Sequence, residues 1–320
     1  MKISNALVYR ITLNPSSHTS QAFEESLQRQ TFIECSPTQQ LSAGWVPPRG
    51  EANGPLLESI GGQWIAQFMT ETRSVPASAM KREVELRAAK IEEMEGRKPG
   101  KKVLHELKEE ALLELLPKAF PRQSVVNVWI DPRSGFLVLD TSSASRGDAV
   151  VTALANALSG VVISPIQTQS TPAGAMAAWL TSQEPPQGFS VDRECVLRST
   201  DESKALVRYG NHALDIEEVR QHVEAGKLPI RLALTWNGRV SFQLTDQFVL
   251  RSIAFLDVVF EEGSKDSRDD AFDADVAIST GELKSLLGGL INALGGEVQP
   301  QDAQLQQSTT TEAQVSFLID

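Results

Sequence analysis

Five aspartates near the C-terminal end of the chain could bind metal ions. Asp266, Asp269, Asp270, Asp273 and Asp275 lie within ten residues of one another. Clustered carboxylates can hold the Mg²⁺ ions of a two-metal nuclease, but such sites usually collect ligands from several elements. Because this run leads into the predicted strand 272–278, a solvated acidic loop is the simpler interpretation. A metal-dependent nuclease is kept as the alternative function.

A second group of charged residues is basic and lies in the middle of the chain. Between positions 81 and 122 there are eleven Lys or Arg and nine Glu, whereas the whole chain has a net charge of −11. Six of these cations stand in two short groups: Arg97, Lys98, Lys101 and Lys102 with no acid among them, and then Lys118 and Arg122 on either side of Phe120. Cations in such numbers suit contacts with phosphates. A solvated tip on an exposed helical hairpin explains them as well.

The sequence contains none of the familiar catalytic or nucleotide-binding motifs. GxxxxGK[ST], GxSxG, HExxH and GxGxxG do not occur. Cys35 and Cys195 are far apart and outside any CxxC spacing, which predicts two reduced core thiols. His212 and His222 are separated by a predicted helix and make only a weak candidate metal pair. We therefore expect a protein that is not an enzyme and needs no cofactor.

Composition and charge limit the class of protein and its partners. With 320 residues, 41% apolar and 22% charged, the chain has room for two or three ordinary soluble domains. No apolar run approaches the roughly 18 residues of a membrane span, and no signal peptide is recognisable, so we expect a cytoplasmic protein with no membrane partner. The net charge of −11 argues against nucleic-acid binding unless the cations gather on one surface.

Hydrophobic periodicity predicts a central α/β domain over 1–75 and 121–185. Its predicted strands are 6–13, 31–35, 63–70, 124–131 and 135–140, its helices 19–30 and 144–158, and the prolines after Gly44 and Trp45 predict a break at 44–48. Residues 76–120 form a helical-hairpin arm, because apolar residues recur every three or four positions on each side of a turn at 96–100. The stripe residues are Met80, Val84, Ala88, Ile91 and Met94, then Leu104, Leu107, Ala111 and Leu115.

A second α/β domain is predicted over 186–297. Its predicted strands are 195–198, 204–209, an antiparallel meander of 228–236, 240–244 and 249–255, and a last strand 272–278. Its helices are 215–224 and 281–294. The glutamine-rich segment 298–320 is predicted to be a disordered tail, ending in VSFLID. The expected fold class is α/β (α+β), multi-domain, with mixed sheets and a protruding helical hairpin.

Eight short blocks, in order between about residues 5 and 297, are similar to the recombination-associated RdgC family. They are GWVPP at 44–48, LLPKAFPR at 115–122, WID at 129–131, EAGK at 224–227, LALTW at 232–236, FDAD at 272–275, TGEL at 280–283 and LGGE at 294–297. The resemblance implies a horseshoe-shaped monomer that closes into a ring-shaped homodimer around DNA. It also implies binding of single- and double-stranded DNA without sequence preference, association with the nucleoid, and negative regulation of RecA-type recombination by competition for DNA.

The resemblance assigns roles to several residues. Phe120 matches the family's aromatic at a ring-closing dimer contact, although a core phenylalanine is the alternative. Arg97, Lys118 and Lys227 match basic positions of the ring's bore. The stretch 210–212 departs from the family where lysine is expected, and Arg208 is the candidate to compensate. A third hypothesis is a protein-interaction module that contacts a recombinase directly through the arm.

Overall fold

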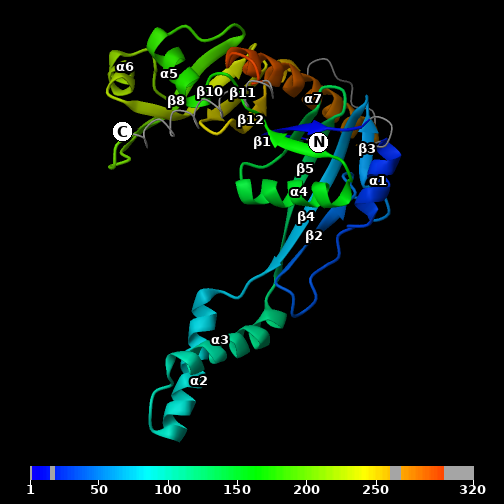
Figure 1. Cartoon of the computed structure of the whole chain (residues 1–320), viewed down its shortest axis with the longest axis vertical. Helices are drawn as coiled ribbons and strands as arrows, with labels where there is room; N and C mark the ends of the chain where they lie inside the picture. The colour runs from blue at the N-terminus through cyan, green and yellow to red at the C-terminus, as the bar shows by residue number, and fades with distance from the viewer. Residues whose placement is uncertain (1, 15–18, 260–267, 299–320) are drawn as a thin grey trace, which may run out of the picture.

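The computed structural model describes residues 2–14, 19–259 and 268–298 as an elongated mixed α/β protein. A broad head and a helical arm lie at opposite ends of the longest axis, and the long strands β4 (Gln63–Arg73) and β5 (Pro121–Asp131) connect them (Figure 1). We call the parts of these strands that project from the head the stalk. No helix in the described ranges is long and apolar enough to cross a membrane.

One continuous sheet of twelve strands runs through the head and into the stalk. The strand order is β2-β4-β5-β6-β1-β12-β11-β10-β8-β9, with β3 beside β4 and β7 beside β1. The remaining strands are β1 (Ala6–Thr12), β2 (Leu41–Val46), β3 (Leu57–Ile60), β6 (Phe136–Leu139), β7 (Val162–Pro165), β8 (Phe189–Ser199), β9 (Leu206–Tyr209), β10 (Lys227–Trp236), β11 (Val240–Thr245) and β12 (Val249–Phe255). Every ladder between these strands is antiparallel, so the prediction of mixed sheets is wrong.

Helices cover this sheet in two places and create two hydrophobic cores. Helices α1 (Ser20–Gln28) and α4 (Ala144–Ala157) pack Phe23 and Leu154 against the parts of β4 and β5 that lie within the head. Helices α5 (Pro172–Ser182), α6 (Glu217–Glu224) and α7 (Arg268–Ala293) pack residues such as Trp179 and Leu286 against β8, β10 and β11. The boundaries of the two α/β domains stay a prediction, since the sheet is continuous through both.

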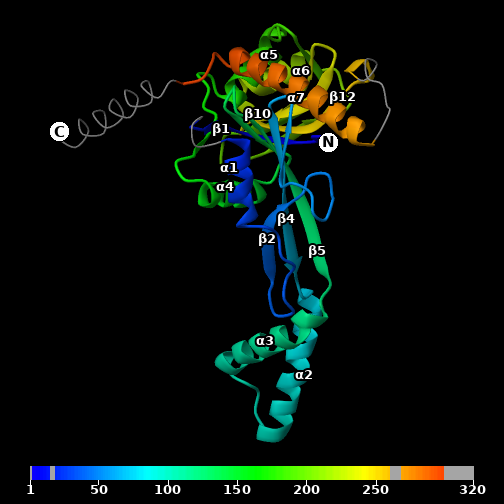
Figure 2. The same ribbon diagram turned by 90° about the vertical axis from the view of Figure 1, so that its right-hand side faces the viewer.

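The helical-hairpin arm is confirmed. Helices α2 (Ala77–Glu95) and α3 (Lys101–Leu115) pack Val84, Leu107 and Ala111 into a small core of their own. Gly96 ends α2 with a φ of 70°, a left-handed conformation that glycine adopts without strain. Met94, predicted to belong to the stripe, is instead 78% exposed. Within the described ranges, no residue of the arm belongs to either head core, and the stalk connects the arm to the head (Figure 2).

Three local predictions are wrong. The 31–35 segment forms a single bridge, between Thr31 and Trp45, in place of a strand. The 44–48 segment continues as β2 up to Val46, because only Pro47 and Pro48 lack the donor that a ladder requires. The predicted strand 272–278 is part of α7: its alternating apolar residues also fit a helix, and Val276 and Leu283 are fully buried. Strands β3 and β7 and helix α5 were not predicted.

An ion pair fastens α7 to the end of β5. Lys284 Nζ lies 2.8 Å from Asp131 Oδ2, and Asp131 is fully buried, whereas the Lys284 side chain is 43% exposed. The other carboxylate oxygen accepts hydrogen bonds from the backbone N–H groups of Arg133 and Ser134. Burial alone would raise the pKa of Asp131, but the interactions with Lys284 and Ser134 outweigh it and hold the pKa below its ordinary value.

Lys284→Met is therefore expected to lower the free energy of unfolding at pH 7. The loss is about 2 to 3 kcal/mol, below the range for a fully buried pair because Lys284 is partly solvated. Because the pKa of Asp131 is lowered in the folded protein, its carboxylate stabilises the fold fully only at pH values above the ordinary Asp pKa of 3.8. The difference in unfolding free energy between the variant and the parent chain should therefore shrink as the pH falls below about 4. Urea titrations at pH 7 and pH 3.5 measure both effects. Arg146→Met, which removes an exposed cation, should change neither.

Candidate nucleic-acid interface

The arm tip gathers the four cations that the sequence singled out. Arg97, Lys98, Lys101 and Lys102 are all exposed and lie where α2 turns into α3. Arg97 lies 3.6 Å from Glu95, and the three lysines make no ion pair with any described residue. A shallow cavity of about 360 Å³ lies among Ile91, Glu95, Arg97, Lys98, Pro99, Gly100 and Val103. The tip is thus a compact positive surface that is open to a ligand.

Helix energetics do not explain the lysines of this tip. Lys101 and Lys102 occupy the first turn of α3, which has no acidic residue and no side-chain cap at Gly100. A cation at a helix N-terminus opposes the helix dipole and costs about 0.3–1 kcal/mol. In contrast, Arg87, farther along the arm, is neutralised by acids of the arm: it contacts Glu83, Glu110 and Glu114. Charge that destabilises its own helix is typical of a site for an external anion.

The second predicted basic group lies at the base of the arm, beside an exposed aromatic ring. Phe120 is 92% exposed, so the alternative of a core phenylalanine is wrong. Lys118 forms an ion pair with Glu114 at 3.0 Å, whereas Arg122 is exposed in β5 opposite Thr72. The length of α3, about 22 Å at 1.5 Å per residue, separates this group from the tip cations.

The head contributes cations on the sheet face opposite α5, α6 and α7. Val196 of β8 is paired with Arg208 of β9 on one side and with Arg231 of β10 on the other, so the two arginines share a face. Arg198 is two residues from Val196 in β8 and therefore points to the same side. Arg251 of β12 is paired with Gln243 of β11, which is two residues from Thr245, the partner of Arg231. We call this surface the open face, because the helices pack on the other side, where Leu197, Leu232 and Phe242 are buried. In Figure 1 those helices lie on the side of the head remote from the arm.

The open face is polar and only partly neutralised by acids. Arg198 pairs with Asp246 at 3.2 Å, and Glu194 accepts a hydrogen bond from Gln243. Asp192 is bonded to the Thr235 hydroxyl group. Among the described residues, Arg208, Arg231 and Arg251 have no acidic partner and remain available for an anion. Of these arginines, the sequence pattern points only to Arg208.

Lys227 lies apart from the open face. It is paired opposite Ser199, which shares the helix side of the sheet with Leu197, and its Nζ lies 3.1 Å from His222 Nδ1. The centroid of the Tyr209 ring is 6.0 Å from the centroid of the His212 ring and 6.4 Å from that of the His222 ring. The role of Lys227 in DNA binding stays a prediction, and its position separates it from Arg208.

The acidic run carries no described metal site. Asp266 and the side chains of Asp269 and Asp270 lie outside the described residues, whereas Asp273 Oδ1 lies 2.6 Å from Arg49 Nη2. Among the residues that the structure describes, no three His, Cys, Asp or Glu side chains are close enough to share a metal ion. The described geometry therefore gives no support to the nuclease alternative.

Both cysteines are free and buried, in agreement with the predicted core thiols. Burial raises the pKa of Cys195 to about 12. The pKa of Cys35 is also raised, mainly by burial and by the nearby Glu71 carboxylate. Thiols with raised pKa values are poor nucleophiles at neutral pH.

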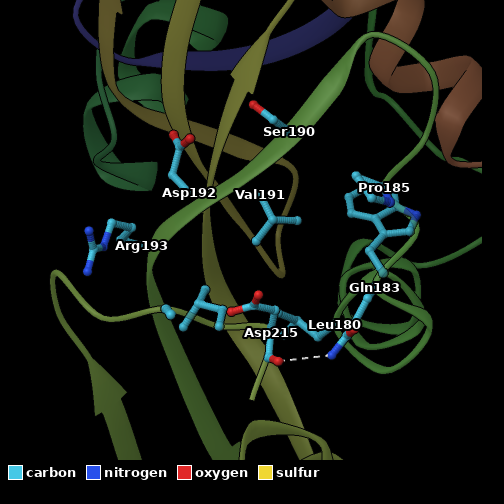
Figure 3. A pocket seen from close by; sticks show the side chains of 11 residues that line it. Leu180, Gln183, Pro185, Ser190, Val191, Asp192, Arg193 and Asp215 are labelled. Carbon is cyan, nitrogen blue, oxygen red and sulfur yellow. Dashed lines mark hydrogen bonds between the residues drawn. The ribbon is translucent and has the colours of Figure 1, made fainter.

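A further cavity beside the head sheet is separate from the open-face arginines. It has a volume of about 500 Å³ and lies between the C-terminal end of α5 and the start of β8 (Figure 3). Trp179, Leu180 and Val191 supply apolar lining, and Asp192, Arg193 and Asp215 supply charge. Two carboxylates against one guanidinium make this cavity a poor site for a phosphate.

Comparisons with known proteins agree with the resemblance noted in the sequence. A family model described as "Putative exonuclease, RdgC" matches residues 1–297. Proteins named recombination-associated protein RdgC are similar along almost their whole length. The one from Cupriavidus necator is 41% identical over 299 residues, and the one from Dechloromonas aromatica is 40% identical over 303. Each match covers 93% of this chain and 99% of the relative. The chain belongs to the RdgC family of recombination-associated proteins.

Proposed function

We propose that this protein binds single- and double-stranded DNA without sequence preference and acts as a ring-shaped homodimer that encloses it. The observation that carries the proposal is the tip of the arm, where Lys101 and Lys102 stand against the dipole of their own helix. Contacts to phosphates depend on charge and not on base identity, so such a surface reads no sequence. The family's association with recombination is consistent with a DNA ligand.

A ring resolves the conflict between the acidic chain and its ligand. With a net charge of −11, the protein as a whole repels phosphates. The arm tip and the open face nevertheless carry cations without acidic partners in the described chain. If two elongated subunits close around a channel, these cations line it and the acids face outward, and the enclosed geometry strengthens the positive potential. The exposed Phe120 suits an anchor in the interface that closes the ring.

The regulatory role follows from occupancy of DNA. A clamp that covers phosphates without sequence preference denies the same DNA to a RecA-type recombinase, so in the cytoplasm it would act on the nucleoid as a negative regulator. Strand-exchange assays test this: added DNA should relieve the inhibition. Inhibition that persists at saturating DNA would instead favour direct contact between the arm and the recombinase.

Arg208→Ala, Arg231→Ala and Arg251→Ala together are expected to weaken DNA binding and its salt dependence. Each lost phosphate contact removes about 0.9 from the slope of log affinity against log salt on duplex DNA, so the triple variant should lose up to about 2.7. Fluorescence anisotropy with labelled duplex at several salt concentrations measures the slope. Arg29→Ala with Arg146→Ala removes exposed cations that lie outside the open face and the arm, and this comparison variant should leave the slope nearly unchanged. An unaltered slope in the triple variant would remove the open face from the interface.

The same samples distinguish a clamp from a nuclease. End-labelled DNA incubated with the protein and Mg²⁺ or Mn²⁺ should stay intact, because a clamp makes no covalent change. Metal-dependent cleavage that disappears in Asp273→Asn and Asp275→Asn would instead support the alternative built on the acidic run.

A further inference from the structure

A groove at the margin of the open face has the character of a binding site for an acidic, apolar peptide segment. It has a volume of about 390 Å³ and lies between the start of α5 and the adjoining ends of β8 and β10. We call it the Arg198 groove. Its lining residues are Ala173, Arg198, Ser199, Thr200, Lys204, Leu228, Ile230 and Asp246.

The charge of the Arg198 groove is positive. Arg198 and Lys204 line it, and its one acidic residue, Asp246, is already paired with Arg198. Ala173 belongs to the first turn of α5, so the positive end of that helix dipole also lies at the groove. The lining of the 500 Å³ cavity between α5 and β8 has a net negative charge, because it contains two carboxylates and one guanidinium.

Exposed leucines lie on either side of the central cation. Leu206 of β9 and Leu228 of β10 are each paired directly opposite Arg198 of β8, and they are 63% and 39% exposed. Side chains that are directly opposite on neighbouring antiparallel strands lie about 5 Å apart on the same face. A strip of leucine, arginine and leucine therefore crosses three strands, and burying the leucines would be favourable.

The chain itself contains a segment with the complementary character. Residues 299–320 include three acids, Asp302, Glu312 and Asp320, and no Lys or Arg. Within the sequence VSFLID at 315–320, Phe317, Leu318 and Ile319 precede Asp320. The family model ends at residue 297, so this segment lies outside what the family shares.

The attachment point of this segment is close to the groove. The backbone N–H of Val298 donates a hydrogen bond to the carbonyl oxygen of Gln167, and the backbone N–H of Ser170 donates one to the carbonyl oxygen of Leu294. Gln167 is six residues from Ala173, which lines the groove, and six residues span at most about 20 Å. The 16 residues from 299 to 314 can span up to about 50 Å, so 315–320 is within reach of its own subunit's groove.

We propose that residues 315–320 bind in the Arg198 groove of the same chain. Phe317, Leu318 and Ile319 cover the strip formed by Leu206 and Leu228, and the carboxylate of Asp320 lies near Lys204. Because the two partners are tethered, even a weak contact is populated at an effective concentration in the millimolar range.

Occupation of the groove would also oppose DNA binding. Arg198 and Arg208 share the open face, so an acidic segment bound there competes with phosphates. This second part rests on the proposed DNA-binding function, whereas the intramolecular contact does not. The segment is thus an internal competitor that lowers DNA affinity until it is displaced.

A dye on the segment tests the contact without DNA. Gln314→Cys supplies a thiol for labelling, and the two native thiols, Cys35 and Cys195, are buried and should not react with the dye. Steady-state anisotropy of the dye should be about twofold higher in the otherwise unchanged chain than in a chain that also carries Phe317→Ser and Leu318→Ser. The groove variant Lys204→Asn with Leu206→Ser should give the same fall, and asparagine tolerates the left-handed φ of 47° at this position.

Lys81→Asn with Leu86→Ser makes the same changes at exposed positions of the arm and should leave the anisotropy high. Anisotropy that does not respond to the groove variant overturns the proposed contact.

Affinity for DNA tests the competition. A chain that ends at Val298 should bind duplex DNA about threefold more tightly at low salt than the full chain. If the segment occupies the groove about two thirds of the time, only about one third of the molecules can bind DNA, and the apparent affinity falls by the same factor. Equal affinity of the two chains overturns the competition. If neither chain binds DNA, the proposed function fails, and the dye measurement still decides whether the segment occupies the groove.

Discussion

Replacing Arg97, Lys98, Lys101 and Lys102 with alanine is expected to flatten the salt dependence of DNA binding more than any other change. If each cation contacts one phosphate of duplex DNA, the slope of log affinity against log salt falls by about 3.6, at 0.9 per contact. At moderate salt this corresponds to an affinity loss of about 10²- to 10³-fold. The fold should be unaffected, because all four side chains are exposed and removing Lys101 and Lys102 relieves repulsion with the dipole of α3.

A matched variant separates position from net charge. Lys81, Arg82, Lys90 and Lys108 are also exposed cations of the arm, but they lie along its helices and outside the turn. Their replacement by alanine changes the net charge equally and should lower the slope much less. Equal slopes for the two variants would mean that the arm acts only through overall charge. An unchanged slope in the tip variant would remove the tip from the interface.

Phe120→Ser is expected to convert the proposed dimer into monomers. An aromatic anchor in an interface contributes about 2 kcal/mol or more, and a symmetric dimer loses two of them. The combined loss of about 4 kcal/mol raises the dissociation constant about a thousandfold. Sedimentation velocity at micromolar concentration measures the change, and DNA affinity should fall with it because a ring that opens releases its ligand. Since Phe120 is 92% exposed in the single chain, its replacement removes no packing from either head core.

Met94→Ser is the appropriate comparison for this experiment. Met94 is an exposed apolar residue of the same arm, at 78% exposure, but it lies at the far end of α2. It should leave the sedimentation coefficient unchanged. A dimer that survives Phe120→Ser would show that the subunits meet elsewhere or that the aromatic ring has another partner.

Local signals in the sequence predicted the arm well. The spacing of Val84, Ala88 and Ile91 fixes which side of α2 is buried, because helical periodicity depends only on neighbours within a few residues. The turn at 96–100 carries its cations in one short stretch, so their proximity needs no tertiary contact. Local periodicity gave the wrong prediction at 272–278, because the alternating apolar residues there fit a strand and a helix equally well. Packing of Val276 in the core favours the helix.

The sequence by itself determined the helical arm, its basic turn and the family, because these depend on residues that are close together along the chain or on whole blocks of identity. Only the tertiary structure decided which cations share a surface. The placement of Arg208, Arg231 and Arg251 on one face depends on the register of five antiparallel strands, and a shift of one residue in any strand would turn its side chains to the other face. Register is set by contacts between distant segments, and the same long-range packing decided that Phe120 remains on the surface.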